Sequence, residues 1–308
     1  MVLFAALFAV ASLAWRVRNR TTIDASLLLR TLLLGVLSGW LLSGFAQAIY
    51  SGLTIESIVE NLSPLSRTGH SITFFGLGAG IAIALALIPQ GRRALAYFDA
   101  LAPSLPLGFA IAKIGCILAG CCAGSLCEYS VAVTYPYGSN SYHAQWRDGL
   151  LTPPAELIHE PPNGQPRLLG HAHALRNTHD NPPKSALDHA HRHDMSYDQL
   201  VASAETVRSL GVWPTPLAYV VTALLLWGYS EIVFRRPSYA GSTIGLVFCG
   251  YGIMRVAFDF FVEFPDPVLL QLSLPQWSGI AALILGLAFS IAGWRLDRIE
   301  DQMDSHPR

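Results

Sequence analysis

Two basic residues lie inside stretches of sequence that are otherwise apolar enough to cross a membrane. Lys113 lies within Leu105–Cys122, and Arg255 lies within Gly241–Phe261. A charged side chain at bilayer depth is costly, so it usually faces a protein-lined or wet interior and has a function. The planar fork of arginine suits bidentate binding of phosphate, whereas lysine supplies a point charge. Together these residues predict a site for an anionic group.

The spacing places the two cations at a similar depth. Lys113 precedes the outer end of its span near Cys122 by nine residues, and Arg255 precedes Phe264 by nine, which in each case corresponds to roughly 14 Å at the rise of an α-helix. Asp259 and Glu263 follow Arg255 at intervals of four residues, so we expect all three on one helix face. An Arg255–Asp259 ion pair that only neutralises itself is the alternative interpretation.

A histidine and several cysteines are further candidates for chemistry. His70 is expected at the outer boundary of a span, where an imidazole that titrates near neutral pH could act as a general base; an interfacial histidine without a catalytic role is the alternative. Four of the five cysteines lie between Cys116 and Cys127. Such a cluster can indicate a metal site, but small residues within a span usually serve close helix packing. We therefore expect packing and no metal, with a Cys122–Cys127 disulfide left open.

The elements that position these residues follow from composition. The 308-residue chain is 52% hydrophobic and only 13% charged. It contains runs near the ~17–25 residues that cross a bilayer. These are Thr31–Tyr50, Ile72–Pro89, Leu105–Cys122, Pro216–Phe234, Gly241–Phe261 and Trp277–Trp294. With the shorter Val2–Trp15, they predict an all-α integral membrane protein, a bundle of about seven transmembrane helices.

Basic residues predict the orientation, because cytoplasmic connections are enriched in lysine and arginine. Alternate connections carry Arg16, Arg18, Arg20 and Arg30, then Arg92 and Arg93, then Arg235 and Arg236, then Arg295 and Arg298. The N-terminus is therefore expected outside and the C-terminus in the cytoplasm. The net charge of −1 says nothing about partners, but the sequence has no basic stripe or aromatic platform that would suggest a nucleic-acid partner.

One large polar segment, 124–211, separates spans 1–4 (1–123) from spans 5–7 and a short tail (212–308), and we expect it to form a periplasmic loop between spans 4 and 5. Tyr129–Leu151 suggests a short strand and a turn, and Thr152–Ser196 has the composition of a partly disordered surface loop. Eight histidines lie in this segment: His143, His159, His171, His173, His179, His189, His191 and His193. We favour a solvated insertion over a metal-binding segment.

Several strings resemble the prolipoprotein diacylglyceryl transferase family. KIGCILAGCCAG (Lys113–Gly124) is similar to its signature segment, SPLSRTGHSITFFGLGAG (Ser63–Gly80) to the segment that leads into a Gly-rich span, and FCGYGIMRVAFDFFVE (Phe248–Glu263) to its YGxxRFxxEF stretch. VTYPYGSNSYHAQWRDGLL (Val133–Leu151) and LSLPQWSGI (Leu272–Ile280) resemble further segments. The resemblance covers nearly the whole chain apart from the histidine-rich insertion.

The resemblance implies a multi-pass enzyme of the bacterial inner membrane that needs no cofactor. It implies transfer of a diacylglyceryl group from phosphatidylglycerol to the lipobox cysteine of a prolipoprotein signal peptide, with release of glycerol phosphate. Arg255, Lys113 and His70 are the expected catalytic residues. The expected substrate-binding residues are Gly124, Asp259, Glu263, Tyr251 and Cys116.

The chain departs from the family pattern at several positions, among them Val262, where the family often has arginine, and Cys116, where it frequently has asparagine. Phe75-Gly76-Leu77 stands where the family has HGG, and Trp213–Tyr219 stands where it has HPxQLYE. These departures leave a second interpretation, a homologue without transfer activity that binds phospholipid or assists another membrane protein. A transporter or metal-handling protein that uses the histidine-rich loop is a third, disfavoured because the spans lack paired broken helices.

Overall fold

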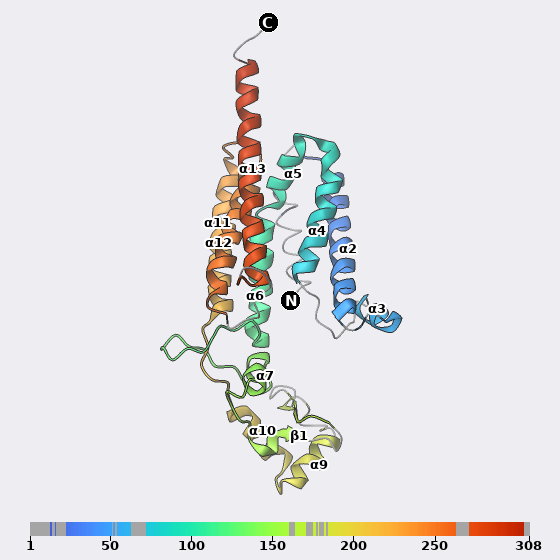
Figure 1. Ribbon diagram of the computed structural model, residues 1–308, viewed down its shortest axis with the longest axis vertical. Helices are drawn as coiled ribbons and strands as arrows, with labels where there is room; N and C mark the ends of the chain where they lie inside the picture. Colours follow the sequence, from blue (N-terminus) through green and yellow to red (C-terminus); the bar gives the residue numbers. More distant parts are fainter. Residues whose placement is uncertain are drawn as a thin grey trace. The chain divides into compact units, whose positions relative to one another are not determined.

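The computed structural model describes residues 13, 16, 23–50, 52, 54–62, 72–159, 164–170, 175–176, 178, 182, 184–262 and 271–304. These residues are mostly helical (Figure 1). The longer helices are α2 (Ala25–Tyr50), α4 (Ile72–Leu87), α6 (Ser104–Ala119), α11 (Thr215–Arg235), α12 (Ser242–Asp259) and α13 (Leu274–Asp304). The shorter elements among them are α3 (Ile55–Leu62), the 3₁₀ turn η1 (Ile88–Gln90) and α5 (Arg93–Leu101).

Four helical segments are long and apolar enough to cross a membrane: Ala25–Ile49, Arg93–Ala119, Thr215–Arg235 and Leu274–Ile299. Phe74–Gln90 is a shorter apolar helix. Helix α12 has 18 residues, which corresponds to about 27 Å at 1.5 Å per residue and falls slightly short of the bilayer core. The expected span Val2–Trp15 lies almost wholly outside the described residues, and the count of seven spans stays a prediction.

The surface of α2 is typical of a helix that faces lipid. Its eight exposed large apolar side chains are Leu29, Leu33, Leu34, Val36, Leu37, Leu41, Phe45 and Ile49. In water, an apolar surface of this extent would be unfavourable. In a bilayer, the helix satisfies its own backbone groups and these side chains contact acyl chains.

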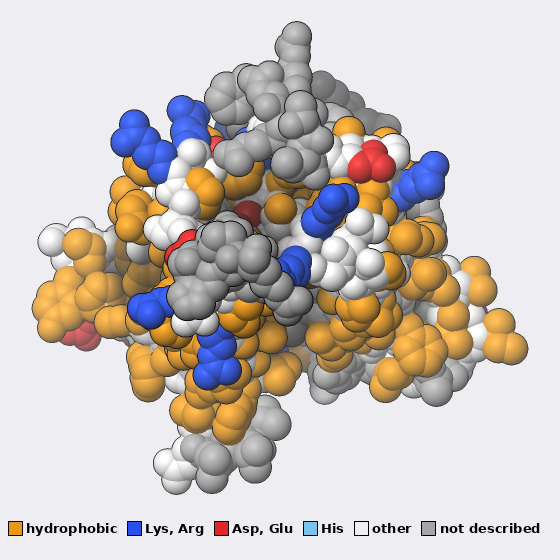
Figure 2. Space-filling view, turned by 90° about the horizontal axis from the view of Figure 1, so that it is seen from above, with side chains coloured by type: hydrophobic (Ala, Val, Ile, Leu, Met, Phe, Trp, Pro, Cys, Tyr) orange, Lys and Arg blue, Asp and Glu red, His pale blue; other side chains and the backbone are white. Residues whose placement is uncertain are grey.

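The chain divides into two compact units. The first contains the described residues of Pro106–Gly228 and Phe248–Leu285, and the second those of Leu7–Leu105, Tyr229–Val247 and Gly286–Arg308. The described basic residues among those that predict the cytoplasmic side belong to the second unit. In Figure 2, Lys and Arg side chains stand out among predominantly hydrophobic ones.

Glycine allows α2 and α4 to pack closely within the second unit. A Cβ atom added to Gly39 would lie 2.6 Å from the Phe75 carbonyl oxygen, and one added to Gly78 would lie 2.7 Å from that of Ser38. Gly76 and Gly80 have no such neighbour within 4 Å. Close helix crossing, the expected role of the Gly-rich run, therefore accounts for part of that run.

The buried carboxylate of Asp99 caps the start of α12 in the second unit. Asp99 of α5 is 5% exposed and accepts hydrogen bonds from the backbone N–H groups of Gly241 (2.7 Å), Thr243 (3.0 Å) and Ile244 (2.9 Å). The first N–H groups of a helix have no partner within it, and a negative charge there is favourable. Asp99 thus serves as a helix cap supplied from a distant part of the sequence.

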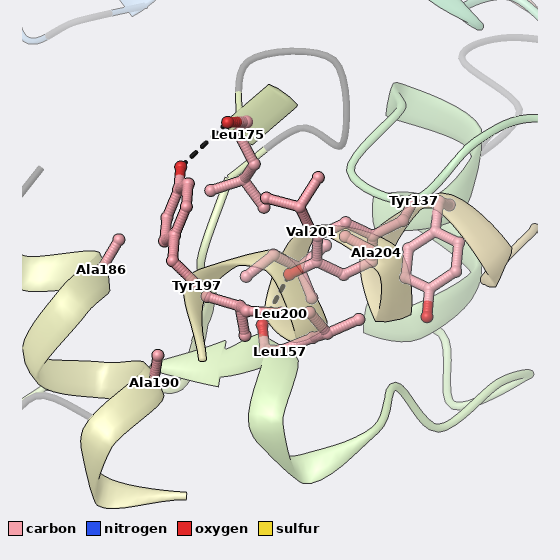
Figure 3. Packing of buried hydrophobic residues seen from close by; sticks show 11 residues of the cluster. Tyr137, Leu157, Leu175, Ala186, Ala190, Tyr197, Leu200, Val201 and Ala204 are labelled. Atoms are coloured by element: carbon pink, nitrogen blue, oxygen red, sulfur yellow. Dashed lines mark hydrogen bonds between the residues drawn. The ribbon is translucent and has the colours of Figure 1, made fainter. Parts of the chain in front are cut away.

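The described residues of the polar segment form a small packed region. Its elements are α7 (Asn140–Arg147), the 3₁₀ turn η2 (Ala155–Leu157), the antiparallel strands β1 (Ile158–His159) and β2 (Arg167–Leu168), α9 (Lys184–Arg192) and α10 (Tyr197–Thr206). Side chains from α10, η2 and the turn before α7 meet in one hydrophobic core (Figure 3). The described residues are ordered because short helices with capped ends bury apolar surface together. The expectation of a partly disordered surface loop for the segment as a whole stays a prediction.

Hydrogen bonds fix this core at two tyrosines. The Tyr137 hydroxyl donates to the Leu157 carbonyl and accepts from the Leu169 N–H at 3.0 Å. The Tyr197 hydroxyl donates to the Leu175 carbonyl at 2.9 Å (Figure 3). Buried tyrosines usually find such partners. Val133, where a short strand is expected, makes only an isolated bridge with Val212.

Candidate functional site

Lys113 of α6 and Arg255 of α12 meet at one aromatic side chain, Tyr219 of α11. The ammonium nitrogen of Lys113 lies 4.6 Å from the centre of the Tyr219 ring. Arg255 donates a 3.2 Å hydrogen bond from Nη1 to the Tyr219 hydroxyl, and its guanidinium carbon lies 5.8 Å from the ring centre. The distance between the Lys113 ammonium nitrogen and the Arg255 guanidinium carbon is therefore at most the sum of their two distances from the Tyr219 ring centre.

An aromatic cluster surrounds these cations. The Phe109 ring packs edge-on against Tyr219 at 5.6 Å and against Tyr251 at 5.5 Å, and the Phe258 ring lies 5.1 Å from Tyr219. Lys113 also lies 5.5 Å from the Phe109 ring centre. The negative face of an aromatic ring attracts a cation by about 0.5–2 kcal/mol. The rings thus hold the two cations while keeping their surroundings apolar.

One N–H donor of the Arg255 guanidinium is available to a ligand. Its Nε is buried and has no hydrogen-bond partner among the described residues, and Lys113 is only 9% exposed. A buried donor without a partner is costly, and the cost is larger for a charged group. An anion that accepts from Nε would remove this cost. The arrangement is suited to binding an anionic oxygen between an arginine and a lysine.

Asp259 does not neutralise Arg255. It is 7% exposed and accepts a hydrogen bond from the Ser273 hydroxyl, and Ser273 and Gln276 form reciprocal hydrogen bonds at the start of α13. The ion pairs found within 4.0 Å in the described part of the chain do not include Arg255–Asp259. The self-neutralising pair is therefore not the arrangement seen here.

The four-residue spacing from Arg255 reaches the end of α12 at Asp259. Residues 260–262, which follow it, are not helical. Glu263 itself lies outside the described residues, as does His70. Their roles stay predictions.

The end of α6 brings three thiols together. Gly120 has φ +61° and the Cys121 N–H donates to the Cys116 carbonyl at 3.0 Å, which is the pattern of a Schellman cap that folds the chain back over the last helical turn. The ligand atoms of Cys116, Cys121 and Cys122 all lie within 4.8 Å of one another. All five cysteines, including Cys122 and Cys127, are free thiols.

Gly124 lies where three backbone segments meet. Its N–H donates to the Trp213 carbonyl at 3.0 Å, and the next residue, Ser125, donates to the Phe261 carbonyl at 2.9 Å. A Cβ at Gly124 would lie 2.5 Å from the Trp213 Cβ and 2.6 Å from the Phe261 carbonyl oxygen. Only glycine fits here, so this position holds the segments after α6, before α11 and after α12 together.

The histidines form a separate group in the polar region. His189 is 3% exposed, and its Nε2 lies 2.9 Å from the Glu156 carbonyl; its ring centre is 5.8 Å from that of His159 and 4.7 Å from that of His193. Burial lowers the pKa of His189. Among the described residues, three or more potential ligands converge only at the cysteines. The histidine-based metal site thus gains no support there.

Sequence reasoning missed Tyr219, the residue on which the two cations converge. Its signal was weak because a tyrosine in an apolar helix most often packs in a core. The cysteines were noticed, but their convergence depends on left-handed backbone at Gly120 and at Cys122, which has φ +56°. Spacing alone does not reveal such a turn.

Comparisons with known proteins agree on one family. The model of the prolipoprotein diacylglyceryl transferase family matches residues 1–292. The chain is 27% identical over 116 residues to a phosphatidylglycerol–prolipoprotein diacylglyceryl transferase of Clostridium tetani, which covers 36% of this chain and 45% of the relative. It is 24% identical over 249 residues to the protein of that name from Rhodopirellula baltica, covering 64% of this chain and 51% of the relative. The match to each relative thus spans about half of that relative's length.

Proposed function

Because the chain belongs to the prolipoprotein diacylglyceryl transferase family, we propose that it transfers a diacylglyceryl group from phosphatidylglycerol to a cysteine thiol. The acceptor would be the lipobox cysteine of a prolipoprotein signal peptide. The enzyme would act in the bacterial inner membrane, with seven spans, its N-terminus outside and its C-terminus in the cytoplasm. Relatives named for this reaction support the proposal.

The observation that carries the proposal is the convergence of Lys113 and Arg255 on Tyr219. The acceptor sulfur attacks the glyceryl carbon that is bonded to a phosphate oxygen. The carbon–oxygen bond breaks, its electron pair stays on the phosphate, and glycerol phosphate leaves with an added negative charge. Fixed cations next to this oxygen stabilise the charge as it develops, which is a large source of catalysis in a site of low polarity.

The remaining residues have supporting roles in this scheme. Arg255 binds the phosphate through Nε and Nη, Lys113 supplies a second charge, and Tyr251 borders the bound lipid. His70 is assigned as the base that removes the thiol proton. Gly124 and Asp259 act by position: Gly124 joins the segments around the site, and Asp259 fixes the start of α13 beside the end of α12.

Release of glycerol phosphate tests the proposal. Purified protein is incubated with phosphatidylglycerol and a lipobox peptide, and glycerol phosphate and lipidated peptide are measured. We expect Arg255→Ala and Lys113→Ala to lower release by at least about 100-fold, because each removes a charge from the leaving group. Arg298→Ala is the matched control, since the guanidinium of Arg298 contacts the Trp294 ring of its own helix, α13, and Arg298 belongs to the second compact unit.

A lipid-binding homologue without transfer activity is the second candidate. The motif departures at Phe75 and at Trp213–Tyr219 favour it. Wild-type protein that binds phosphatidylglycerol through Arg255 but releases no glycerol phosphate would establish this candidate and refute the transferase.

A further inference from the structure

Three thiols lie close together at the end of α6, and the scheme above gives them no chemical step. They belong to Cys116 in the last helical turn and to Cys121 and Cys122 in the turn that follows. We propose that they form a thiol–disulfide exchange centre that reduces a disulfide at the acceptor cysteine. Diacylglyceryl transfer needs this cysteine as a free thiol, so the inference rests on the proposed function.

The three sulfur atoms are close enough for exchange between them. They all lie within 4.8 Å of one another, and no histidine, carboxylate or other cysteine of the described residues joins the group. A disulfide requires two sulfurs about 2 Å apart, a distance that rotation of the cysteine side chains can reach. The Cys121 N–H donates to the Cys116 carbonyl at 3.0 Å, which folds the turn back over the helix end and keeps the side chains together.

The exposed thiol is the attacking group. Cys122 is exposed, whereas Cys116 and Cys121 are half-buried. Exchange begins when an accessible thiolate attacks a disulfide sulfur, so Cys122 is the nucleophile. A second thiol must then attack Cys122 to release the product. Cys116 suits this step better than Cys121, because a disulfide between neighbouring residues would close a small ring over a planar trans peptide bond.

The anion site lies next to the attacking thiol. Lys113 and Arg255 both interact electrostatically with the Cys122 sulfur, and neighbouring basic side chains favour a reactive thiolate. The same two cations are the proposed phosphate ligands. An acceptor thiol that is released at Cys122 is therefore already close to the donor lipid.

The backbone holds Cys122 in an unfavourable conformation. Its φ of +56° is left-handed, which is uncommon for a residue other than glycine, and such strain is concentrated at functional sites. The Thr215 hydroxyl holds the turn by donating a 2.8 Å hydrogen bond to the Cys122 carbonyl. Helix packing by small residues, the role expected from the sequence, requires neither the strained cysteine nor this hydrogen bond.

The exchange conserves atoms and electrons. The Cys122 thiolate attacks the acceptor sulfur, and the former partner of that sulfur leaves as a thiolate. Cys116 then gives its proton to solvent and attacks the Cys122 sulfur, so that the acceptor leaves as a thiolate. Two protein thiols are oxidised to a disulfide, and the acceptor disulfide is reduced to two thiols. A dithiol reductant on the exported side, where disulfides form and persist, restores the protein thiols by the same reaction.

A single turnover tests the exchange without lipid. The probe is a lipobox peptide whose cysteine is joined by a disulfide to cysteamine. Full-length protein in detergent is reduced, the reductant is removed, and the probe is added. Mass spectrometry then measures free peptide thiol and protein disulfides. We expect one free peptide thiol per chain and a Cys116–Cys122 disulfide.

Three variants assign the steps. Cys122→Ser should lower peptide release at least about 10-fold, because it removes the attacking thiolate. Cys116→Ser should stop at a mixed disulfide between Cys122 and the peptide. Cys249→Ser is the matched control and should behave as the wild type, because Cys249 lies outside the thiol group. No peptide release by the wild type, or release by Cys122→Ser at the wild-type rate, would overturn the exchange centre.

A second readout separates this proposal from the transferase. Glycerol phosphate release is measured with phosphatidylglycerol and peptide that is already reduced. Cys122→Ser should retain this release; if it loses both activities, the Cys116→Ser variant decides, and a mixed disulfide that is absent or lies elsewhere than at Cys122 overturns the centre. Wild-type peptide reduction without glycerol phosphate release keeps the exchange centre and overturns the transferase. Glycerol phosphate release without peptide reduction does the reverse.

Discussion

Substitutions of Tyr219 distinguish its two kinds of contact with the cations: the hydrogen bond of its hydroxyl and the cation–π contact of its ring. Tyr219→Phe removes only the hydroxyl, which accepts a 3.2 Å hydrogen bond from Arg255. The ring remains, with the Lys113 ammonium 4.6 Å from its centre. Tyr219→Leu removes both the hydroxyl and the aromatic face.

The size of each effect follows from these contacts. A hydrogen bond to a charged group contributes about 1.5–3 kcal/mol, and tenfold in rate corresponds to about 1.4 kcal/mol. Tyr219→Phe should therefore lower kcat/KM for phosphatidylglycerol by about 10- to 100-fold. Tyr219→Leu also loses the cation–π contacts of both cations, about 0.5–2 kcal/mol each, so we expect at least about fivefold more.

The assay is the release of glycerol phosphate at several lipid concentrations, which gives kcat and KM separately. Tyr229→Phe is the control, because Tyr229 lies on the same helix and is 56% exposed. If the phenylalanine and leucine variants both retain the wild-type kcat/KM, Tyr219 does not organise the clamp and the reasoning fails. If leucine is no worse than phenylalanine, the ring contact with Lys113 is without consequence.

Three further predictions concern stability. Asp99→Asn should lower the free energy of unfolding by about 1–3 kcal/mol, because the side-chain amide cannot replace the charge that caps α12; thermal unfolding in detergent tests this, and a change no larger than that of exposed Asp297→Asn would contradict it. Gly124→Ala should lower the same quantity by about 1–3 kcal/mol through its close approach to Trp213, whereas Gly228→Ala, with no atom within 4 Å of the added Cβ, should be neutral or slightly stabilising. Burial lowers the pKa of His189, so its neutral form stabilises the polar region above about pH 6.5 and this contribution is lost as the pH falls through the lowered pKa. Hydrogen exchange of α9 between about pH 7 and pH 5 measures this loss, and an undiminished pH dependence in His189→Gln would refute the assignment.

Much of the helical architecture was predictable because membrane spans leave a strong local signal. The apolar runs at Thr31–Tyr50, Pro216–Phe234 and Trp277–Trp294 each fall within a helix of the structure. The predicted span Leu105–Cys122 is longer than the helix in the structure. That helix ends at Ala119, and the last three residues of the predicted span form the turn that brings the cysteines together. A glycine with left-handed backbone ends the helix at this point, and apolar composition does not indicate such a turn.

The polar region was the least predictable part. Its core depends on Tyr137, Leu157 and Leu200, which lie far apart in the sequence. None of the helices described in this region exceeds ten residues, and such short helices are marginal by themselves. The low apolar content between them indicated a loop, whereas packing across the whole region decides that they form.

The sequence by itself determined that Lys113 and Arg255 lie within apolar helices, and that the chain resembles a family of lipid-modifying enzymes. These properties are local: a charge in an apolar run and a motif are visible within about twenty residues. Only the tertiary structure decided that both cations meet at Tyr219, that Asp259 binds Ser273 instead of Arg255, and that three sulfurs converge beyond α6. Such pairings depend on how each helix is rotated about its axis and how its end turns, and these are set by packing against other helices.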